Sequence, residues 1–215
     1  MDKYRDLWIP TGDTKTAPAN YKEWEEKGQA ILDLVPEKGI CIQAGGNFGY
    51  FAIKLAPHFD KVYTWEPAPA TWDCMVKNIE ELSEHQDRIV MFNEALGAKT
   101  AKATVYKETE GNAGALQLIY SDDGEFPVSC VDDLDLPRCD LMWLDIEGFE
   151  LEALAGAKET IQKYKPVIVI ENKGLIPNMG GSLSGSTNMD QWVCAQGYRK
   201  HSRMQRDDIY VKSGT

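Results

Sequence analysis

The 215-residue sequence lacks the usual features of metal-bound, disulfide-bonded and membrane-spanning proteins. Its five cysteines form no Cys-x-x-Cys pair, and its three histidines share no spacing typical of a metal site. We therefore expect neither a disulfide framework nor structural zinc. No apolar run is long enough to cross a bilayer, and no basic segment followed by an apolar stretch opens the chain. These absences predict a soluble, cytoplasmic protein without a membrane span.

Positive charge is also scarce. The chain has 23 lysines and arginines against 34 acidic residues, which gives a formal net charge of −11. This balance opposes binding to a phosphate backbone, so we do not expect nucleic acid as a partner. The length and the 43% hydrophobic content suit one globular domain. We expect an N-terminal arm and helix, residues 1–36, packed on a main domain, residues 37–215.

A glycine-rich turn at residues 45–49 organises the chain. An apolar segment at residues 40–42 predicts a short buried strand, and residues 51–56 predict a helix. Gly45, Gly46 and Gly49 between them let the backbone approach a ligand closely, and the helix start offers free N–H groups. A tight turn in an ordinary α/β unit is the alternative interpretation.

Strands and helices alternate through the rest of the chain, which predicts an α/β fold with a mostly parallel sheet and helices on both faces. Further strands are expected at residues 61–65, 88–96, 100–107, 127–131, 141–144, 167–170, 198–201 and 209–212. Helices are expected at residues 21–35, 69–82, after residue 148 and at 191–196. Asn20 and Glu23 resemble a capping box at the start of the first helix. Residues 1–20 are expected to be irregular.

Polar residues collect where the predicted parallel strands end. They are Gln43, Glu66, Glu94, Asp145 with Glu147, and Glu171 with Asn172. In open α/β sheets the ligand crevice lies at the carboxyl ends of the strands, so we expect a binding site there. Glu66 follows the glycine turn by roughly 20 residues, the separation at which an acid accepts both hydroxyls of a ribose. The pattern therefore predicts a cofactor that contains adenosine.

Five segments in this order resemble the FkbM-type methyltransferases, over about residues 38–172. They are Gln-Ala-Gly-Gly-Asn-Phe-Gly-Tyr-Phe at 43–51, Val-Tyr-Thr-Trp-Glu-Pro-Ala-Pro at 62–69, Asn-Glu-Ala-Leu-Gly at 93–97, Leu-Asp-Ile-Glu-Gly-Phe-Glu-Leu-Glu-Ala-Leu-Ala-Gly-Ala at 144–157, and Lys-Pro-Val-Ile-Val-Ile-Glu at 165–171. The resemblance implies a three-layer, Rossmann-like class I methyltransferase fold for the main domain. It also implies S-adenosylmethionine as cofactor and a hydroxyl oxygen of a sugar, glycan or small natural product as methyl acceptor.

The resemblance also implies roles for single residues. The methionine part of the cofactor would lie among Gln43, Gly45, Asn47 and Gly49, the ribose at Glu66 beside Pro67, and the adenine at Glu94 and Ala95. Asp145 would face the amino group or the reacting centre. Family members generally have an acid where this chain has Gln43. Glutamine can still accept a hydrogen bond from an ammonium group, but it lacks the negative charge.

Methyl transfer to a hydroxyl requires that the acceptor's proton be taken up. Carboxylates held close together have raised pKa values and can do this, so Asp145, Glu147 and Glu171 are the predicted catalytic residues. For Glu147, capping of the following helix is the alternative. A divalent cation held by Asp145, Glu171 and Asn172 would also activate a hydroxyl, but a metal is not expected.

Two other functions are also compatible with the sequence. A nicotinamide-dependent oxidoreductase would use a similar fold, although Ala44 stands where a dinucleotide fingerprint has its first glycine. A non-catalytic scaffold that kept the fold is the other alternative.

The basic run at residues 199–206 is either a solvated face or a rim for an anionic acceptor. The Gly/Ser-rich segment 174–190 is either a lid or a linker. The sequence does not define the oligomeric state.

Overall fold

A seven-stranded sheet forms the centre of the protein. The computed structural model describes residues 1–109, 111–172 and 186–214. The strand order is β12-β13-β11-β10-β3-β4-β5, and β13 alone runs in the direction opposite to the other strands of this sheet. The mostly parallel sheet predicted from the sequence is therefore confirmed. The strands are β3 (Ile40–Ala44), β4 (Lys61–Trp65), β5 (Ile89–Phe92), β10 (Leu141–Leu144), β11 (Val167–Glu171), β12 (Tyr198–Met204) and β13 (Asp207–Lys212).

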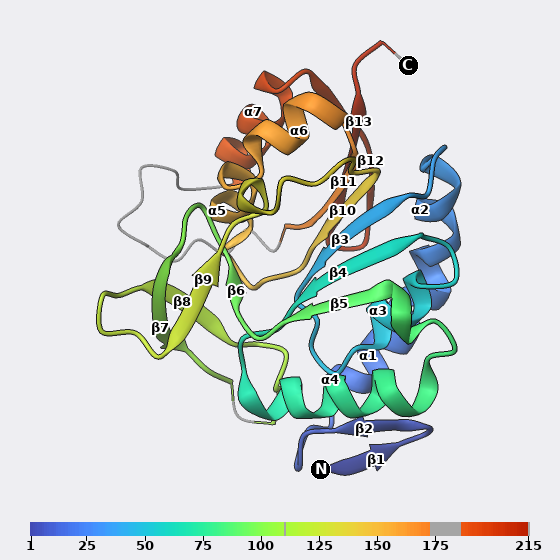
Figure 1. Ribbon diagram of the computed structural model, residues 1–215, viewed down its shortest axis with the longest axis vertical. Coiled ribbons are helices and arrows are strands. Elements are labelled where there is room, and N and C mark those ends of the chain that lie inside the picture. The colour runs from blue at the N-terminus through green and yellow to red at the C-terminus, as the bar shows by residue number, and fades with distance from the viewer. Residues whose placement is uncertain (110, 173–185, 215) are drawn as a thin grey trace.

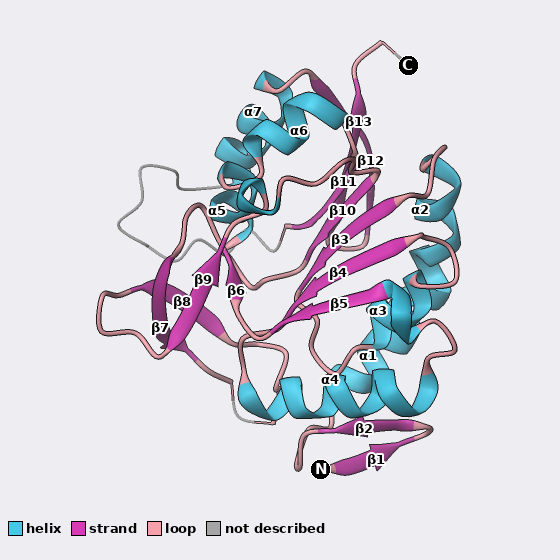
Figure 2. Ribbon diagram, in the orientation of Figure 1, coloured by secondary structure: helices cyan, strands magenta, loops and turns pink. Residues whose placement is uncertain are grey.

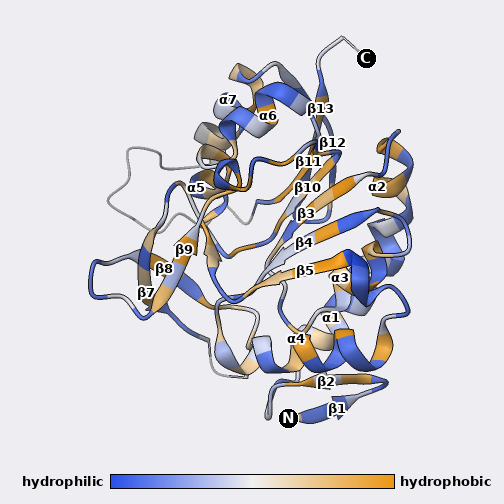
Figure 3. Cartoon of the chain, in the orientation of Figure 1, coloured by the Kyte–Doolittle hydropathy of each residue, from blue (hydrophilic) through white to orange (hydrophobic). Residues whose placement is uncertain are grey.

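Helices cover both faces of this sheet (Figures 1 and 2). One face carries α1 (Thr16–Glu23), a π-helical turn (Trp24–Gly28), α2 (Gln29–Leu34), α3 (Tyr50–Leu55) and α4 (Pro69–Leu82). The other carries α5 (Glu150–Ala155), α6 (Lys158–Tyr164) and α7 (Ser186–Ala195). Side chains alternate along each strand, so Cys41 and Trp143 enter the first core whereas Ile42 and Leu144 enter the second. In Figure 3, β5 is coloured hydrophobic, whereas α6 is coloured mostly hydrophilic.

A second, four-stranded sheet lies beside the first. It contains β6 (Ala95–Leu96), β9 (Phe126–Ser129), β7 (Ala101–Lys107) and β8 (Gln117–Tyr120), in that order. The single strand predicted at residues 88–96 is therefore wrong. The chain leaves the main sheet after Phe92 and enters the small sheet at Ala95, because Asn93 turns back and donates a hydrogen bond to the carbonyl of Glu66 at 2.9 Å. A separate core of Ala103, Leu118, Val128 and Phe149 holds this sheet together.

The N-terminal arm differs from the prediction. Residues expected to be irregular contain an antiparallel hairpin of β1 (Asp2–Tyr4) and β2 (Leu7–Ile9), and Leu7 and Ile9 are buried in the first core. The first helix begins at Thr16 instead of residue 21. Asp13 accepts hydrogen bonds from the backbone N–H groups of Lys15 and Thr16, both at 2.9 Å, so Asp13 takes the capping role that the sequence suggested for Asn20.

Two further predicted boundaries change in the second half of the chain. The helix expected after residue 148 is divided into α5 and α6 around Gly156, where a Cβ atom would lie 2.1 Å from the carbonyl oxygen of Gly97. The last helix begins at Ser186, five residues before the predicted start. Most of the Gly/Ser-rich segment considered as a lid, residues 173–185, lies outside the described residues. Cys41 and Cys74 are buried free thiols.

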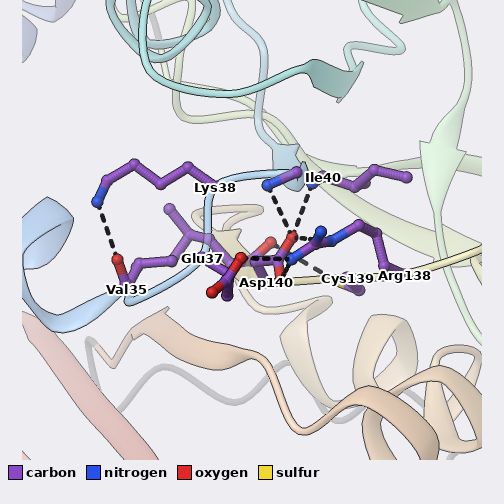
Figure 4. Close-up of polar contacts among 9 residues, drawn as sticks. Val35, Glu37, Lys38, Ile40, Arg138, Cys139 and Asp140 are labelled. Atoms are coloured by element: carbon purple, nitrogen blue, oxygen red, sulfur yellow. Dashed lines mark hydrogen bonds and ion pairs between the residues drawn. The ribbon is translucent and has the colours of Figure 1, made fainter.

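The edge of the sheet opposite the carboxyl ends of the parallel strands is fixed by Asp140 (Figure 4). Its carboxylate accepts hydrogen bonds from the N–H groups of Gly39 and Ile40, at 3.0 and 2.9 Å, and it also binds the Arg138 guanidinium at 2.7 and 2.8 Å. These contacts join the start of β3 to the start of β10 and set their register, in which Leu144 lies beside Ala44. The residues that follow, Gly45 and Asp145, therefore emerge side by side. Within the described residues, no helix is both long and apolar enough to span a membrane.

Candidate functional site

The glycine turn after β3 is held tightly against the neighbouring strands. The N–H groups of Gly45 and Gly46 both donate to the carbonyl of Trp65, at 3.2 and 2.7 Å. Gly45 has a φ of +88°, and a Cβ atom at this position would lie 1.9 Å from the backbone oxygen of Asp145. Both the backbone angle and the contact require glycine here. The turn thus presents bare backbone between the ends of β3, β4 and β10.

Gln43 supports this turn from below. Its side chain is 3% exposed, its amide oxygen accepts a hydrogen bond from the Thr64 hydroxyl at 2.6 Å, and its amide nitrogen donates to the carbonyl of Gly45 at 2.9 Å. A carboxylate has no proton to donate to that carbonyl and would repel it. The glutamine that departs from the family pattern therefore has a structural reason, because it bridges β4 and the turn.

Glu66 closes the other side of the turn. One carboxylate oxygen accepts a hydrogen bond from the N–H of Asn47 at 2.7 Å, and the second accepts from the N–H of Ala68 at 2.9 Å and the Thr71 hydroxyl at 2.7 Å. Burial raises the pKa of Glu66, and these hydrogen bonds partly offset that rise. A carboxylate has about four acceptor positions, so three protein donors leave one for a ligand hydroxyl.

A cavity of about 480 Å³ opens over these groups. All the predicted catalytic and cofactor-binding residues except Gly49 lie at its wall: Gln43, Gly45, Asn47, Glu66, Pro67, Glu94, Ala95, Asp145, Glu147 and Glu171. Gly49 instead caps α3 with a φ of +86° and faces Met75, so it shapes the turn from behind. The convergence of residues this far apart in the sequence makes the cavity the candidate functional site.

Three carboxylates meet at the end of the cavity beside β10 and β11. Asp145, Glu147 and Glu171 each bring one oxygen to within 4.8 Å of the others. Like charges at this separation favour sharing of a proton or a cation. Asn172 lies away from this group, because its amide donates to the buried Asp208 at 2.7 Å and it does not line the cavity. Of the three cation ligands considered from the sequence, Asn172 is therefore wrong.

The turn after β10 is closed by a residue that the sequence did not single out. Glu150 accepts hydrogen bonds from the N–H groups of Ile146 and Gly148, both at 3.1 Å, and Phe149 is the N-cap of α5. Glu147 has a φ of +55° in this turn and lines the cavity, and Phe149 instead of Glu147 occupies the N-cap position of α5. Burial raises the pKa of the Glu150 carboxyl to about 7.

The N-terminal helix contributes a wall that sequence reasoning missed. Thr16, Asn20, Glu23 and Lys27 all line the cavity from one face of α1 and the π-helical turn. Thr16 donates a hydrogen bond to the Asn112 side chain at 3.0 Å, which ties this wall to the loop between β7 and β8. The sequence carries only a weak signal for this wall. A helical stripe of polar residues ahead of the apolar stripe at Ile31 usually marks a solvated face.

Lys27 is the buried centre of this wall. Its side chain is 3% exposed and pairs with Glu23 at 2.5 Å and with Asp207, the first residue of β13. Burial lowers the pKa of Lys27, but the charges of Asp207 and Glu23 outweigh it, so the net shift is upward. Burial raises the pKa of Glu23 to about 7 against the pull of Lys27, and the charge of Asp145 adds to that rise.

The basic run near the C-terminus divides into two groups. Lys200 pairs with Asp190 and Asp208, at 2.7 and 3.1 Å, and Arg203 pairs with Asp208 at 3.5 Å. These pairs neutralise acids on neighbouring elements. Arg206 differs because it lines the cavity, 4.0 Å from Glu171. A rim for an anionic acceptor would therefore involve Arg206 and not the run as a whole.

The family model described as "Methyltransferase FkbM domain" matches residues 43–200. A search of curated proteins found no matching sequence. Among solved structures, the fold resembles an FkbM methyltransferase from Methylobacillus flagellatus KT, with a TM-score of 0.57 and 19% identity, over 81% of this chain. The chain spans 43% of the length of that protein.

Two other solved structures share the fold along nearly all of their length. A magnesium protoporphyrin IX methyltransferase (ChlM) from Synechocystis PCC 6803, solved with bound SAM, gives a TM-score of 0.50 at 11% identity and covers 93% of this chain and 85% of its own. A precorrin-6y C5,15-methyltransferase from Geobacter metallireducens GS-15 gives 0.51 at 10% identity, with 98% and 96% coverage. These likenesses confirm the predicted Rossmann-like class I fold.

Proposed function

Because this chain belongs to the FkbM methyltransferase family, we propose that it binds S-adenosylmethionine in the cavity and transfers the methyl group to a hydroxyl oxygen. The proposed acceptor is a sugar, glycan or small natural product. One observation carries the proposal: residues from four separate strand ends, Gly45, Glu66, Glu94 and Asp145, line one cavity of about 480 Å³. A non-catalytic scaffold would not require polar groups from several strand ends to line one cavity.

The order of the strands divides the cavity into two halves. Gly45 and Glu66 follow β3 and β4, and Glu94 precedes β6, so these residues form one half. Asp145 follows β10 and Glu171 ends β11, on the other side of β3 and beside the start of β13. We assign the cofactor to the first half and the acceptor to the second. The free acceptor position of Glu66 suits a ribose hydroxyl, and Gln43 and Asn47 suit the polar end of the methionine part.

The sulfonium of the cofactor supplies an activated methyl group, so the protein mainly aligns the reactants and excludes water. Asp145, Glu147 and Glu171 are proposed to hold the acceptor hydroxyl by hydrogen bonds and to stabilise the positive charge that it develops. The acceptor oxygen forms the new bond to the methyl carbon, the carbon–sulfur bond breaks with its electron pair going to sulfur, and the hydroxyl proton passes to a carboxylate. A divalent cation at these three oxygens is the second candidate for hydroxyl activation.

Calorimetry with three ligands tests the proposed function. We expect submicromolar to micromolar binding of S-adenosylmethionine and S-adenosylhomocysteine, and none of NAD. Binding of NAD alone would support the oxidoreductase. If none of the three binds, the result supports the non-catalytic scaffold.

The proposed catalytic carboxylates have their own test. A screen with methyl-labelled S-adenosylmethionine and a panel of sugars, glycosides and glycolipids would identify an acceptor. Asp145→Ala and Glu171→Ala should each then lower turnover by roughly 100-fold, a typical size for a lost acid–base or orienting group. Unchanged turnover in both variants would refute the proposed role of these carboxylates as general base. Full activity after exhaustive chelation would exclude the cation.

A further inference from the structure

We infer that Glu23 is a further catalytic residue of this site, which accepts the proton released by the acceptor hydroxyl while Lys27 and Asp207 hold it in position. The inference rests on the proposed methyl transfer. It adds a base from the N-terminal helix to the carboxylates on the strand ends.

Glu23 lies at the wall of the cavity. It is the last residue of α1, and its side chain is 19% exposed. One carboxylate oxygen lies 2.5 Å from the ammonium of Lys27. Among the residues that the structure describes, none donates a hydrogen bond to the other oxygen. That second oxygen is therefore available to an acceptor hydroxyl.

Lys27 and Asp207 place Glu23 in the acceptor half. The ammonium of Lys27 contacts both carboxylates, and Asp207 lies beside Glu171 in the pairing of β13 with β11. The Lys27 ammonium also lies 5.6 Å from the centre of the Trp143 ring, two residues before Asp145. The N-terminal helix is thus fixed to the same strand ends that carry the proposed catalytic carboxylates.

The local backbone supports a special role for this segment. Residues Trp24–Gly28 form a π-helical turn, which is rare and occurs frequently at functional sites. The Trp24 ring covers Gly28 so closely that a Cβ atom there would lie 2.7 Å from it, and the same ring stacks on Trp143 at 6.3 Å. The turn therefore packs as a unit against β10, and it holds Glu23 and Lys27 on the cavity face.

The charges around Glu23 suit a base that works near neutral pH. The groups that face it are Lys27 on its own helix, Asp145 after β10 and Asp207 on β13. Burial raises its pKa to about 7, Lys27 opposes that rise, and Asp145 and Asp207 add to it. A base is most effective when its pKa lies near the working pH. In the reaction, a bond forms between the proton and the free Glu23 oxygen as the acceptor O–H bond breaks, and solvent removes the proton after product release.

Direct titration of Glu23 provides a test that needs no acceptor. In protein labelled with ¹³C at the glutamate carboxyl carbon, the resonance that is missing from Glu23→Gln is assigned to Glu23. We expect it to titrate with a midpoint near 7, and we expect Asp145→Asn to move the midpoint down, because a repelling charge is lost. A midpoint at the ordinary value of 4.5, unchanged by Asp145→Asn, would overturn the inference.

Kinetics then test the role in turnover, with methyl transfer to the best sugar or glycoside from the screen. The wild-type kcat should rise with pH and level off above about 7, and Glu23→Gln should lose this rise and about 100-fold in kcat. Affinity for S-adenosylhomocysteine should stay the same. Glu25→Gln, an exposed neighbour outside the cavity, is the matched control and should behave as wild type. A Glu23→Gln enzyme that keeps its kcat and its pH profile would contradict the inference, whereas a wild type that binds no cofactor would refute the proposed function instead.

Discussion

At the scale of single residues, the site depends on backbone angles that most amino acids avoid. Gly45, Asn47 and Glu147 all have positive φ, at +88°, +50° and +55°, and all three line the cavity. Strained positions of this kind persist only where the surroundings enforce them, and they concentrate at functional sites. Here the enforcing contacts are the Trp65 carbonyl for the first turn and the Glu150 carboxylate for the second.

Substitution of Gly45 separates steric contact from backbone strain. Gly12 provides the matched control, because its φ of +82° is similar but nothing lies within 4 Å of a Cβ there. We expect Gly12→Ala to cost about 1 kcal/mol of unfolding free energy, the penalty of a left-handed alanine. Gly45→Ala should cost at least about 2 kcal/mol more, because the Asp145 backbone must move, and it should abolish cofactor binding. Urea denaturation and calorimetry measure both, and equal costs for the two variants would contradict the close contact.

Glu150 predicts how stability depends on pH. Its pKa is raised by burial from 4.5 to about 7, so the folded protein binds this proton more tightly than the unfolded chain does. The stabilisation is complete below pH 4.5 and is lost as the pH rises through about 7, by about 3 kcal/mol in total. Glu150→Gln should remove that loss from urea unfolding curves recorded between pH 4.5 and 8. Glu84→Gln, at an exposed position, is the control. Parallel pH profiles for Glu150→Gln and wild type would refute the buried carboxyl's role.

At the scale of elements, the sequence predicts segments that carry their own local signal. Strand β3, the glycine turn and α3 combine an apolar run, three glycines and a helical pattern, so the first loop of the candidate site could be located. The small sheet could not be assembled in the same way. Its strands β6 and β9 have two and four residues, and their pairing is set by the separate core around Phe149, which lies far along the chain. The π-helical turn likewise has no pattern distinct from that of an α-helix.

The local sequence pattern also misplaced the start of α1, and the observed start can be tested by mutation. Asn20 matched a capping box, yet it lies inside the helix, and Asp13 binds the free N–H groups at 2.9 Å. Asp13 also accepts a hydrogen bond from the N–H of Ala113, in the loop between β7 and β8, at 3.3 Å. Asp13→Ala should therefore lower the unfolding free energy by about 1 to 2 kcal/mol, whereas Asn20→Ala should leave it nearly unchanged. Thermal and urea unfolding provide the comparison, and the reverse order would restore the helix start predicted from the sequence.

At the scale of the whole molecule, the candidate site lies at the carboxyl ends of the parallel strands of the central sheet. The register of β3 against β10, fixed by Asp140 at the opposite edge, brings Gly45 beside Asp145. The N-terminal helix and the loop between β7 and β8 then enclose the space above, where Thr16 meets Asn112. The strand ends of the site could be predicted because parallel strands share an edge. The enclosing walls could not, since they come from segments whose place is decided only by tertiary packing.

The central claim is that this cavity binds an adenosine-bearing cofactor through Glu66 at the ribose. The most direct test is a crystal structure of the protein with S-adenosylhomocysteine. The account predicts the ligand within the cavity, with a ribose hydroxyl in hydrogen-bond distance of Glu66 and the sulfur directed toward Glu23, Asp145 and Glu171. A ligand bound on another face of the protein, or a ribose held by other residues while Glu66 keeps only its three protein donors, would contradict it.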